Sequence, residues 1–247
     1  MRHDPLQVLH AARPPGPAQR KPRLLIAGAT GVLGNEVLRR LAGSSAFADT
    51  QVLAREPIIA GLRGVATVVV PPAPPSQWPP GAADVGIVLF DPPRLFYDRE
   101  RALWTPEPAQ LPGLARWLHA SGVHTLALVL PHDQGRLPDA LKRGLADLDE
   151  QAVAALGFQR VVIIRSARKP AAAAPRTLAH RLARLMLSVF QYMVPSSEQP
   201  VRAATVAQLL ALALELAPPG IHVASPETVW RAAQGEVRAA VRQWLGA

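Results

Sequence analysis

The segment "RLLIAGATGVLGNEVLRRLAG", residues 23–43, has the spacing of a phosphate-binding turn. Gly28, Gly31 and Gly34 follow a short apolar run and precede residues with helical periodicity. In such a turn the first glycine permits a tight bend, the second lets the backbone approach a pyrophosphate, and the third lets the helix pack on the sheet. A helix starting near Val32 would direct its unpaired amides and positive dipole end at the phosphates. The spacing predicts a dinucleotide site, and a glycine-rich turn without a ligand is the alternative.

Further residues complete this candidate cofactor site. We expect a bound dinucleotide to contact Thr30, Val32 and Leu33 in the turn, and Phe90 where the apolar run "ADVGIVLF" ends. No Gly-Lys-Ser or Gly-Lys-Thr follows the glycines, which excludes the P-loop of nucleoside triphosphatases.

The residue that ends the second predicted strand distinguishes the two nicotinamide dinucleotides. An acid there accepts hydrogen bonds from a ribose 2′-hydroxyl, whereas an arginine pairs with a 2′-phosphate. The strand "TQVLAR" ends at Arg55, and a guanidinium binds phosphate through two parallel hydrogen bonds. We therefore expect NADP(H) rather than NAD(H). An arginine solvated in a loop is the alternative in so arginine-rich a chain.

Alternating strands and helices position these residues. Continuous apolar runs separated by helical patterns are typical of a parallel sheet covered on both faces. We predict an α/β fold, a Rossmann-type doubly wound parallel sheet with small, mainly helical C-terminal additions. Its parts are a flexible, basic, proline-rich tail (1–22), the NAD(P)-binding Rossmann core (23–170) and a helical extension that completes the cleft (171–247). The strands are expected at 23–29, 50–55, 64–70, 83–90, 124–130, 160–166 and 220–225, and the helices of the core at 34–43, 108–122 and 139–157.

Composition narrows the class of protein. The chain has 247 residues, 49% of them hydrophobic, which is enough for a packed core. Cysteine is absent and the seven histidines are scattered, so we expect no disulfide, thiol nucleophile or metal site. No apolar run is long enough to span a bilayer and no hydrophobic signal core begins the chain, so we expect a cytoplasmic protein.

The net charge of +9 is concentrated in two regions, residues 1–23 and 165–184. Only three of the 27 basic residues are lysines, a bias that indicates a coding preference for arginine rather than a nucleic-acid partner. Binding of nucleic acid through these two regions is an alternative. Residues 176–193 form a basic amphipathic pattern, which we expect to pack on its own domain; docking on a membrane or an acidic protein is the alternative.

Several blocks together resemble a known family. "LLIAGATGVLGNEVLRRL", "VLAREP" and "ADVGIVLF" resemble the atypical, NAD(P)-binding branch of the short-chain dehydrogenase/reductase superfamily. The later blocks "GLARWLHASGVHTLALVL" and "VPSSEQPVRAATVAQLLALALE" are similar to the Tat-interacting-protein-like oxidoreductases, and the resemblance covers about residues 22–233. It implies a Rossmann fold, a bound NAD(P) and oxidoreductase-like chemistry.

The catalytic residues of active members do not have counterparts here. The resemblance implies a Ser or Thr after the fifth strand, where this chain has Leu130 and Pro131. It also implies Tyr-x-x-x-Lys on the next helix. One alignment places Lys142 at the tyrosine and Ala146 at the lysine, and another takes Lys142 as the lysine and places Pro138 at the tyrosine. Neither restores the pair.

Carbonyl reduction also needs an acid within hydrogen-bond reach of the substrate oxygen. His132 and Asp133 follow the position expected for the serine, and with Lys142 they are the candidates for such an acid; a polar loop is the alternative. We therefore predict an NADP(H)-binding, oxidoreductase-like protein with a degenerate Ser/Tyr/Lys site, a pseudoenzyme that senses or carries the nucleotide or regulates a partner, which is a small molecule or a protein; catalysis of an unusual reaction through other groups is an alternative. The alternative is a basic, non-catalytic interaction scaffold that has lost the nucleotide.

Overall fold

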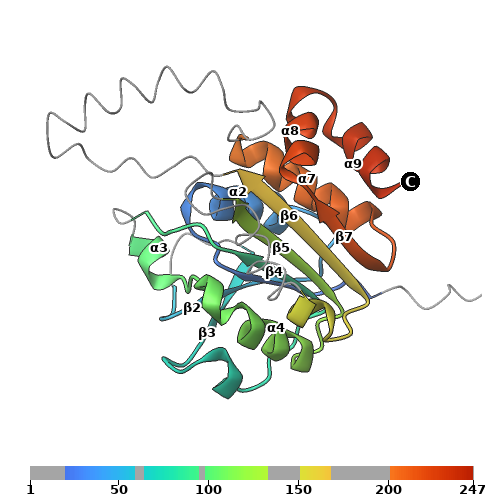
Figure 1. Ribbon diagram of the computed structural model, residues 1–247. Coiled ribbons are helices and arrows are strands. Elements are labelled where there is room, and N and C mark those ends of the chain that lie inside the picture. Colours follow the sequence, from blue (N-terminus) through green and yellow to red (C-terminus); the bar gives the residue numbers. More distant parts are fainter. Residues whose placement is uncertain (1–19, 59–63, 95–97, 133–150, 168–200, 247) are drawn as a thin grey trace, which may run out of the picture.

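The computed structural model describes residues 20–58, 64–94, 98–132, 151–167 and 201–246. Within them, seven parallel strands form one sheet in the order β3-β2-β1-β4-β5-β6-β7 (Figure 1). The predicted Rossmann-type doubly wound sheet is confirmed. The strands are Leu24–Ala27 (β1), Thr50–Ala54 (β2), Val65–Val69 (β3), Val85–Leu89 (β4), Thr125–His132 (β5), Arg160–Ala167 (β6) and Gly220–Ala224 (β7).

The strand order reverses between β1 and β4, which pair in parallel on either side of this point. In open α/β sheets a crevice forms there, outside the carboxyl ends of the strands, and ligands bind in it. The glycine turn follows β1 directly, so the fold places it at this crevice.

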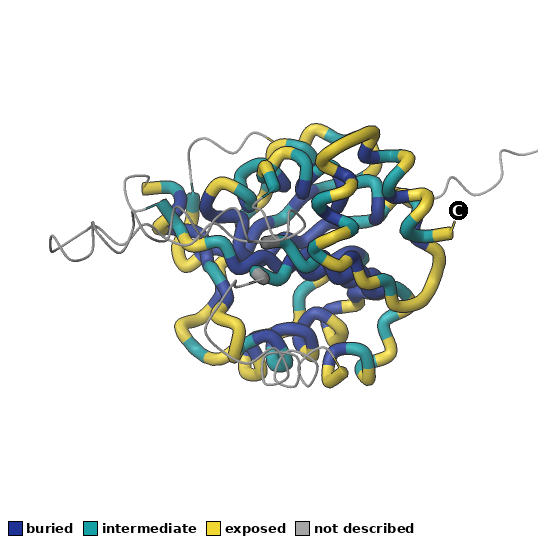
Figure 2. Tube along the Cα trace, turned by 45° about the horizontal axis from the view of Figure 1, so that its top comes forward, coloured by how far each residue is buried: buried dark blue, intermediate teal, exposed yellow. Residues whose placement is uncertain are grey.

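Side chains alternate between two apolar layers because successive residues of a strand point to opposite faces. Leu24 and Ile26 belong to one buried cluster, whereas Leu25 and Ala27 belong to the other. The first face is covered by α2 (Gly31–Ala42), α7 (Ala203–Leu216), α8 (Pro226–Gln234) and α9 (Val237–Leu245), and the second by α4 (Leu111–Ala120). Buried segments run through the middle of the molecule, between the two layers of helices (Figure 2).

Local differences from the predicted elements have physical reasons. The proline-rich stretch 71–81 is a loop, as predicted, but contains one 3-10 turn, η1 (Pro75–Gln77). β5 continues two residues beyond its expected end because His132 still pairs with Ala167 of β6. The short helix α3 (Asp98–Ala102) was not predicted, and the predicted helix 108–122 begins with a separate 3-10 turn, η2 (Pro108–Gln110), before α4. β7 extends the same sheet, so part of the C-terminal region belongs to the core.

No helix in the described ranges is both long and apolar enough to cross a membrane.

Candidate dinucleotide site

The glycine turn has the backbone that its sequence predicts. Gly28 and Gly31 have φ angles of 80° and 67°, a region that side chains disfavour. A Cβ atom on Gly34 would lie 2.6 Å from the Gly28 carbonyl oxygen, so this glycine does allow close packing of helix on turn. The helix α2 begins at Gly31, one residue before the predicted start.

The first amide of this helix is already bound. The Gly31 N–H donates to Oε2 of Glu100 at 3.0 Å, and the Glu100 side chain is fully buried. The Leu33 N–H donates to Oδ2 of Asp91 at 2.9 Å. These amides and the positive end of the helix dipole are the groups that hold a pyrophosphate in dinucleotide-binding turns. In this protein two of its own carboxylates take that place.

Glu100 makes four hydrogen bonds, about the number that a carboxylate can accept. Oε2 accepts from the backbone N–H groups of Gly31 at 3.0 Å and Arg94 at 2.6 Å. Oε1 accepts from Nδ2 of Asn35 at 2.9 Å and Nε of Arg94 at 2.7 Å. Burial opposes the charge of Glu100, but the hydrogen bonds and charge of Arg94, with the Gly31 amide, outweigh it and lower the pKa of Glu100. Glu100 is therefore an anion at neutral pH.

Asp91 fixes the other side of the turn. Its backbone oxygen accepts from the Thr30 hydroxyl at 2.6 Å, while its side chain binds the Leu33 amide. The Gly31 position has no room for a side chain, because a Cβ atom there would lie 2.2 Å from Oδ2 of Asp91. The second glycine thus allows close approach of a carboxylate of the chain itself.

Residues 98–106, which we name the blocking segment, lie against the ends of β1 and β2. The Arg55 N–H donates to the Ala102 carbonyl at 2.7 Å, and the Trp104 N–H donates to the Leu53 carbonyl at 2.9 Å. The Gly28 N–H in turn donates to the Trp104 carbonyl at 3.2 Å. The blocking segment is therefore hydrogen-bonded to the end of β2 and to the glycine turn that follows β1 at the crevice.

Aromatic packing holds the blocking segment in place. The rings of Trp104 and Trp78 meet edge to face, with centroids 4.9 Å apart, and Trp78 meets Trp117 of α4 in the same way at 5.2 Å. All three indoles are buried. Thr105 adds a hydroxyl contact of 3.0 Å to Thr30.

The other predicted cofactor residues lie at the same edge with different exposure. Thr30 is fully buried, Phe90 packs in the core, and Val32 is 59% exposed. Arg55 follows β2 with an exposed side chain, where a 2′-phosphate partner was expected.

Few of the predicted catalytic positions can be placed. Leu130 and Pro131 lie in β5, where Pro131 pairs with Ser166 of β6, so the position expected for a serine lies within the sheet. His132 is the last residue of β5. The remaining candidates and both tyrosines lie outside the described residues: Asp133, Lys142, Tyr97 and Tyr192.

The residues present do not fit a dinucleotide in this conformation. The carboxylates of Glu100 and Asp91 already accept hydrogen bonds from the amides of the glycine turn. The blocking segment lies against the ends of β1 and β2. An anionic pyrophosphate would have to replace two anions that are already hydrogen-bonded.

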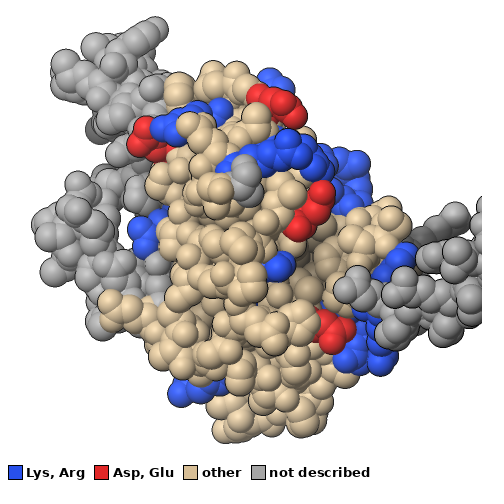
Figure 3. Space-filling view, turned by 90° about the vertical axis from the view of Figure 1, so that its right-hand side faces the viewer, with Lys and Arg blue, Asp and Glu red and all other residues tan. Residues whose placement is uncertain are grey.

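No candidate metal site is found in the part of the chain that the structure describes. It holds no group of three His, Asp or Glu side chains that could bind a metal ion. On the face in Figure 3, basic side chains lie beside acidic ones. Two such pairs belong to the C-terminal helices, Arg231 with Glu227 and Arg238 with Glu215. Of the two basic regions, residues 1–23 and 165–184, the structure describes only 20–23 and 165–167.

Sequence reasoning missed Asp91 and Glu100. Asp91 follows β4 at the crevice edge, which is a usable signal because ligand-binding side chains gather where parallel strands end. Glu100 gave no comparable signal, since its partner Gly31 is 69 residues away in the sequence.

Comparison with solved structures places this fold among known proteins. A nucleoside-diphosphate-sugar epimerase from Staphylococcus aureus matches with a TM-score of 0.50 and 12% identity, over 82% of this chain and 71% of that one. The chain shares the Rossmann-type fold of that protein. This is the fold that the resemblance to the short-chain dehydrogenase/reductase superfamily implied.

Two weaker matches are proteins whose structures contain NAD. MoeE5 in complex with UDP-glucuronic acid and NAD matches with a TM-score of 0.48 and 13% identity, over 81% of this chain and 75% of that one. UDP-glucuronic acid 4-epimerase from Bacillus cereus in complex with NAD matches with a TM-score of 0.44 and 12% identity, over 82% and 78%. Neither protein-family models nor the sequences of curated proteins match this chain.

Proposed function

We propose that this protein is a non-catalytic, NADP(H)-responsive Rossmann protein whose nucleotide site is closed by its own carboxylates until a dinucleotide displaces them. The observation that carries the proposal is the buried hydrogen bond of 3.0 Å from the Gly31 amide to Glu100. A carboxylate on this amide copies the charge and acceptor geometry of a phosphate oxygen. Such a protein senses the nucleotide through the position of the blocking segment.

The donor set supports the choice of ligand. The Gly31 and Leu33 amides and the Arg94 guanidinium surround the two carboxylates, and these donors would suit an anion with several oxygens. The exposed side chain of Arg55 at the end of β2 favours NADP(H) over NAD(H), since a guanidinium complements a 2′-phosphate.

The absence of reductase chemistry rests on the positions of two residues. Neither Leu130 nor Pro131 has a hydroxyl to polarise a substrate carbonyl, and both lie in β5. We expect no oxidation of NADPH above background with a panel of aldehydes and ketones. If oxidation occurs, a His132→Ala variant that remains active excludes His132 as the acid.

Calorimetric titration with NADPH, NADP⁺, NADH and NAD⁺ tests the proposal. A protein whose open form is rare binds with its intrinsic affinity reduced by the open fraction. We expect weak binding of NADPH to the wild type and at least about tenfold tighter binding to the double variant Asp91→Asn/Glu100→Gln. Arg55→Ala in that background should remove the preference for NADPH over NADH.

A matched control separates closure from net charge. Glu36→Gln/Glu227→Gln removes the same charge from two side chains outside the blocking segment, which form ion pairs with the exposed Arg39 and Arg231 among the described residues. This control should bind NADPH as weakly as the wild type. Equal affinities of wild type and Asp91→Asn/Glu100→Gln at micromolar NADPH would show that the carboxylates do not compete.

The second candidate function is a scaffold that has lost the nucleotide. The hydrogen bonds of Glu100 favour this function. Its carboxylate accepts four of them, so the closed turn is stable without a nucleotide. This function predicts no heat with any of the four dinucleotides, in the wild type or in Asp91→Asn/Glu100→Gln.

A further inference from the structure

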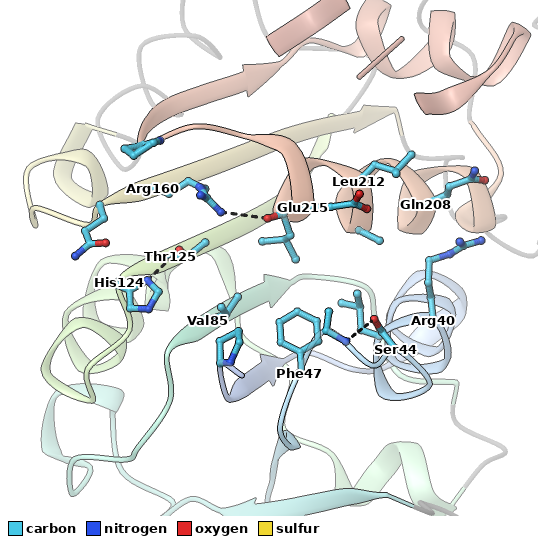
Figure 4. Close-up of a pocket in the computed structure, with 17 residues that line it drawn as sticks. Arg40, Ser44, Phe47, Val85, His124, Thr125, Arg160, Gln208, Leu212 and Glu215 are labelled. Atoms are coloured by element: carbon cyan, nitrogen blue, oxygen red, sulfur yellow. Dashed lines mark hydrogen bonds between the residues drawn. The ribbon is translucent and has the colours of Figure 1, made fainter. Parts of the chain in front are cut away.

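A second hollow lies at the opposite edge of the sheet, where the strands begin. It has a volume of about 580 Å³, within the range of small-molecule sites. Val85 begins β4, Thr125 begins β5 and Arg160 begins β6 on one side, and the last two turns of α7 form the other (Figure 4). Five residues of β4, about 16 Å of strand, separate this hollow from the blocked crevice. We name it the amino-edge cavity.

The cavity contains two cationic groups with unused donors. Within the described residues, three buried side-chain nitrogen or oxygen atoms have no hydrogen-bond partner, and two of them are Nε of Arg40 and Nε of Arg160. Both arginines line the cavity, and the third atom, Oδ1 of Asp49, does not belong to its lining. Because both Nε atoms are buried among protein atoms, a ligand in the cavity would reach these guanidinium groups at their terminal nitrogens.

The charge of the cavity is positive. Its only acidic lining residue, Glu215, is held by Arg238 through contacts of 2.9 and 3.2 Å to its two oxygens. Arg160 uses one nitrogen, Nη1, to bind the Leu214 carbonyl at 3.1 Å, which leaves its charge without an acid. A guanidinium has donors and no acceptor, so the complementary ligand supplies anionic oxygens.

The remaining wall is mostly apolar. In Figure 4, Phe47 and Val85 lie next to each other on one wall of the cavity, and Leu212 of α7 lies across from them. Apolar walls with a few polar groups at fixed positions are typical of sites for small organic molecules. An inorganic ion would leave these walls uncovered.

We propose that the amino-edge cavity binds an organic anion whose apolar body lies on Phe47, Val85 and Leu212 and whose carboxylate, or a like oxyanion, pairs with Arg160 or Arg40. The charge of the N-terminal tail does not complement that of the cavity. Pro22 lines the cavity, but residues 1–21 carry Arg2, Arg13, Arg20 and Lys21 against a single acid, Asp4.

Calorimetry with 2-naphthoate and its neutral isostere 2-naphthamide tests this proposal on the full chain. We expect saturable binding of the acid and at least about tenfold weaker binding of the amide, because hydrogen bonds to charged groups contribute strongly. Equal affinities for acid and amide, or no binding of the acid up to its solubility limit, overturn the proposal.

Two variants and one control locate the site. Arg160→Gln and Arg40→Gln should each weaken naphthoate binding by about tenfold, whereas Arg116→Gln, on the exposed face of α4, should not. Arg160→Gln also removes the bond to Leu214, so its thermal unfolding is compared with wild type; Arg40→Gln loses no protein partner at Nε. Unchanged affinity in both variants contradicts the assignment. Naphthoate binding should be the same in Asp91→Asn/Glu100→Gln, so this test is independent of the dinucleotide proposal.

Discussion

Polar groups at the two edges of the sheet differ in whether they are paired within the chain. At the carboxyl edge, the amides of Gly31 and Leu33 are paired with carboxylates of the chain itself. At the amino edge, the Nε atoms of Arg40 and Arg160 are buried without a partner. In Rossmann proteins the carboxyl edge is the usual place for a ligand. Here the usual place is filled from within, and the unpaired donors lie at the other end of the strands.

This difference teaches that the presence of a binding turn and its availability are separate properties. Gly28 and Gly31 keep the backbone angles of a phosphate-binding turn. Their contacts are nevertheless with Leu89, Asp91 and Trp104 of the same chain. The glycines therefore have a structural role even without a nucleotide.

The largest predicted contrast between the edges comes from alanine in place of glycine. A Cβ on Gly28 would lie 2.0 Å from the Leu89 carbonyl oxygen at a φ of 80°, so Gly28→Ala should cost about 4 kcal/mol of unfolding free energy through backbone strain and overpacking. Gly43, beside the amino-edge cavity, has a φ of −84° and room for a methyl group. Gly43→Ala should change stability by about 0.5 kcal/mol, in the stabilising direction. Urea unfolding of both variants measures the contrast, and equal losses would contradict it.

Replacing one arginine with methionine at each edge should give the second-largest contrast in unfolding free energy. Arg94→Met leaves the buried Glu100 without its counter-charge and should cost about 3 kcal/mol of unfolding free energy. Arg40→Met removes a side chain with an unpaired Nε and should change stability by about 0.5 kcal/mol or less. The same denaturation measurement applies. A large loss in Arg40→Met would mean that Arg40 stabilises the fold and is not held for a ligand.

The smallest effect is a dependence on pH confined to the carboxyl edge. The pKa of Glu100 is lowered in the folded protein, so its stabilising contribution is present above the unfolded pKa of about 4.3 and is lost as pH falls through the folded value. The stability advantage of wild type over Glu100→Gln should be constant above about pH 6 and decrease below about pH 4. Glu56→Gln, at an exposed position, should show no such trend. A stability advantage of wild type over Glu100→Gln that grows as pH falls would contradict this prediction.

Predictions from the sequence succeeded where the signal was local. The strands were predicted because continuous apolar runs such as Val85–Leu89 are buried on both faces, and the glycine turn because its three glycines lie within seven residues. The contacts that close the site could not be predicted in this way. Leu33 and Asp91 are 58 residues apart, and no periodicity relates a helix amide to a carboxylate across that distance. The amino-edge cavity depends likewise on the meeting of α2, three strand starts and α7, which only the folded chain brings together.

The most direct test of the central claim is the amide signal of Gly31 in a two-dimensional ¹H–¹⁵N NMR spectrum. We predict that this signal shifts strongly in Glu100→Gln, where the charged acceptor is lost, and remains in place when NADPH is added to the wild type at micromolar concentration. A Gly31 signal that is unchanged in Glu100→Gln, or that moves with micromolar NADPH in the wild type, would show that the turn is open to the nucleotide and that Glu100 does not close it.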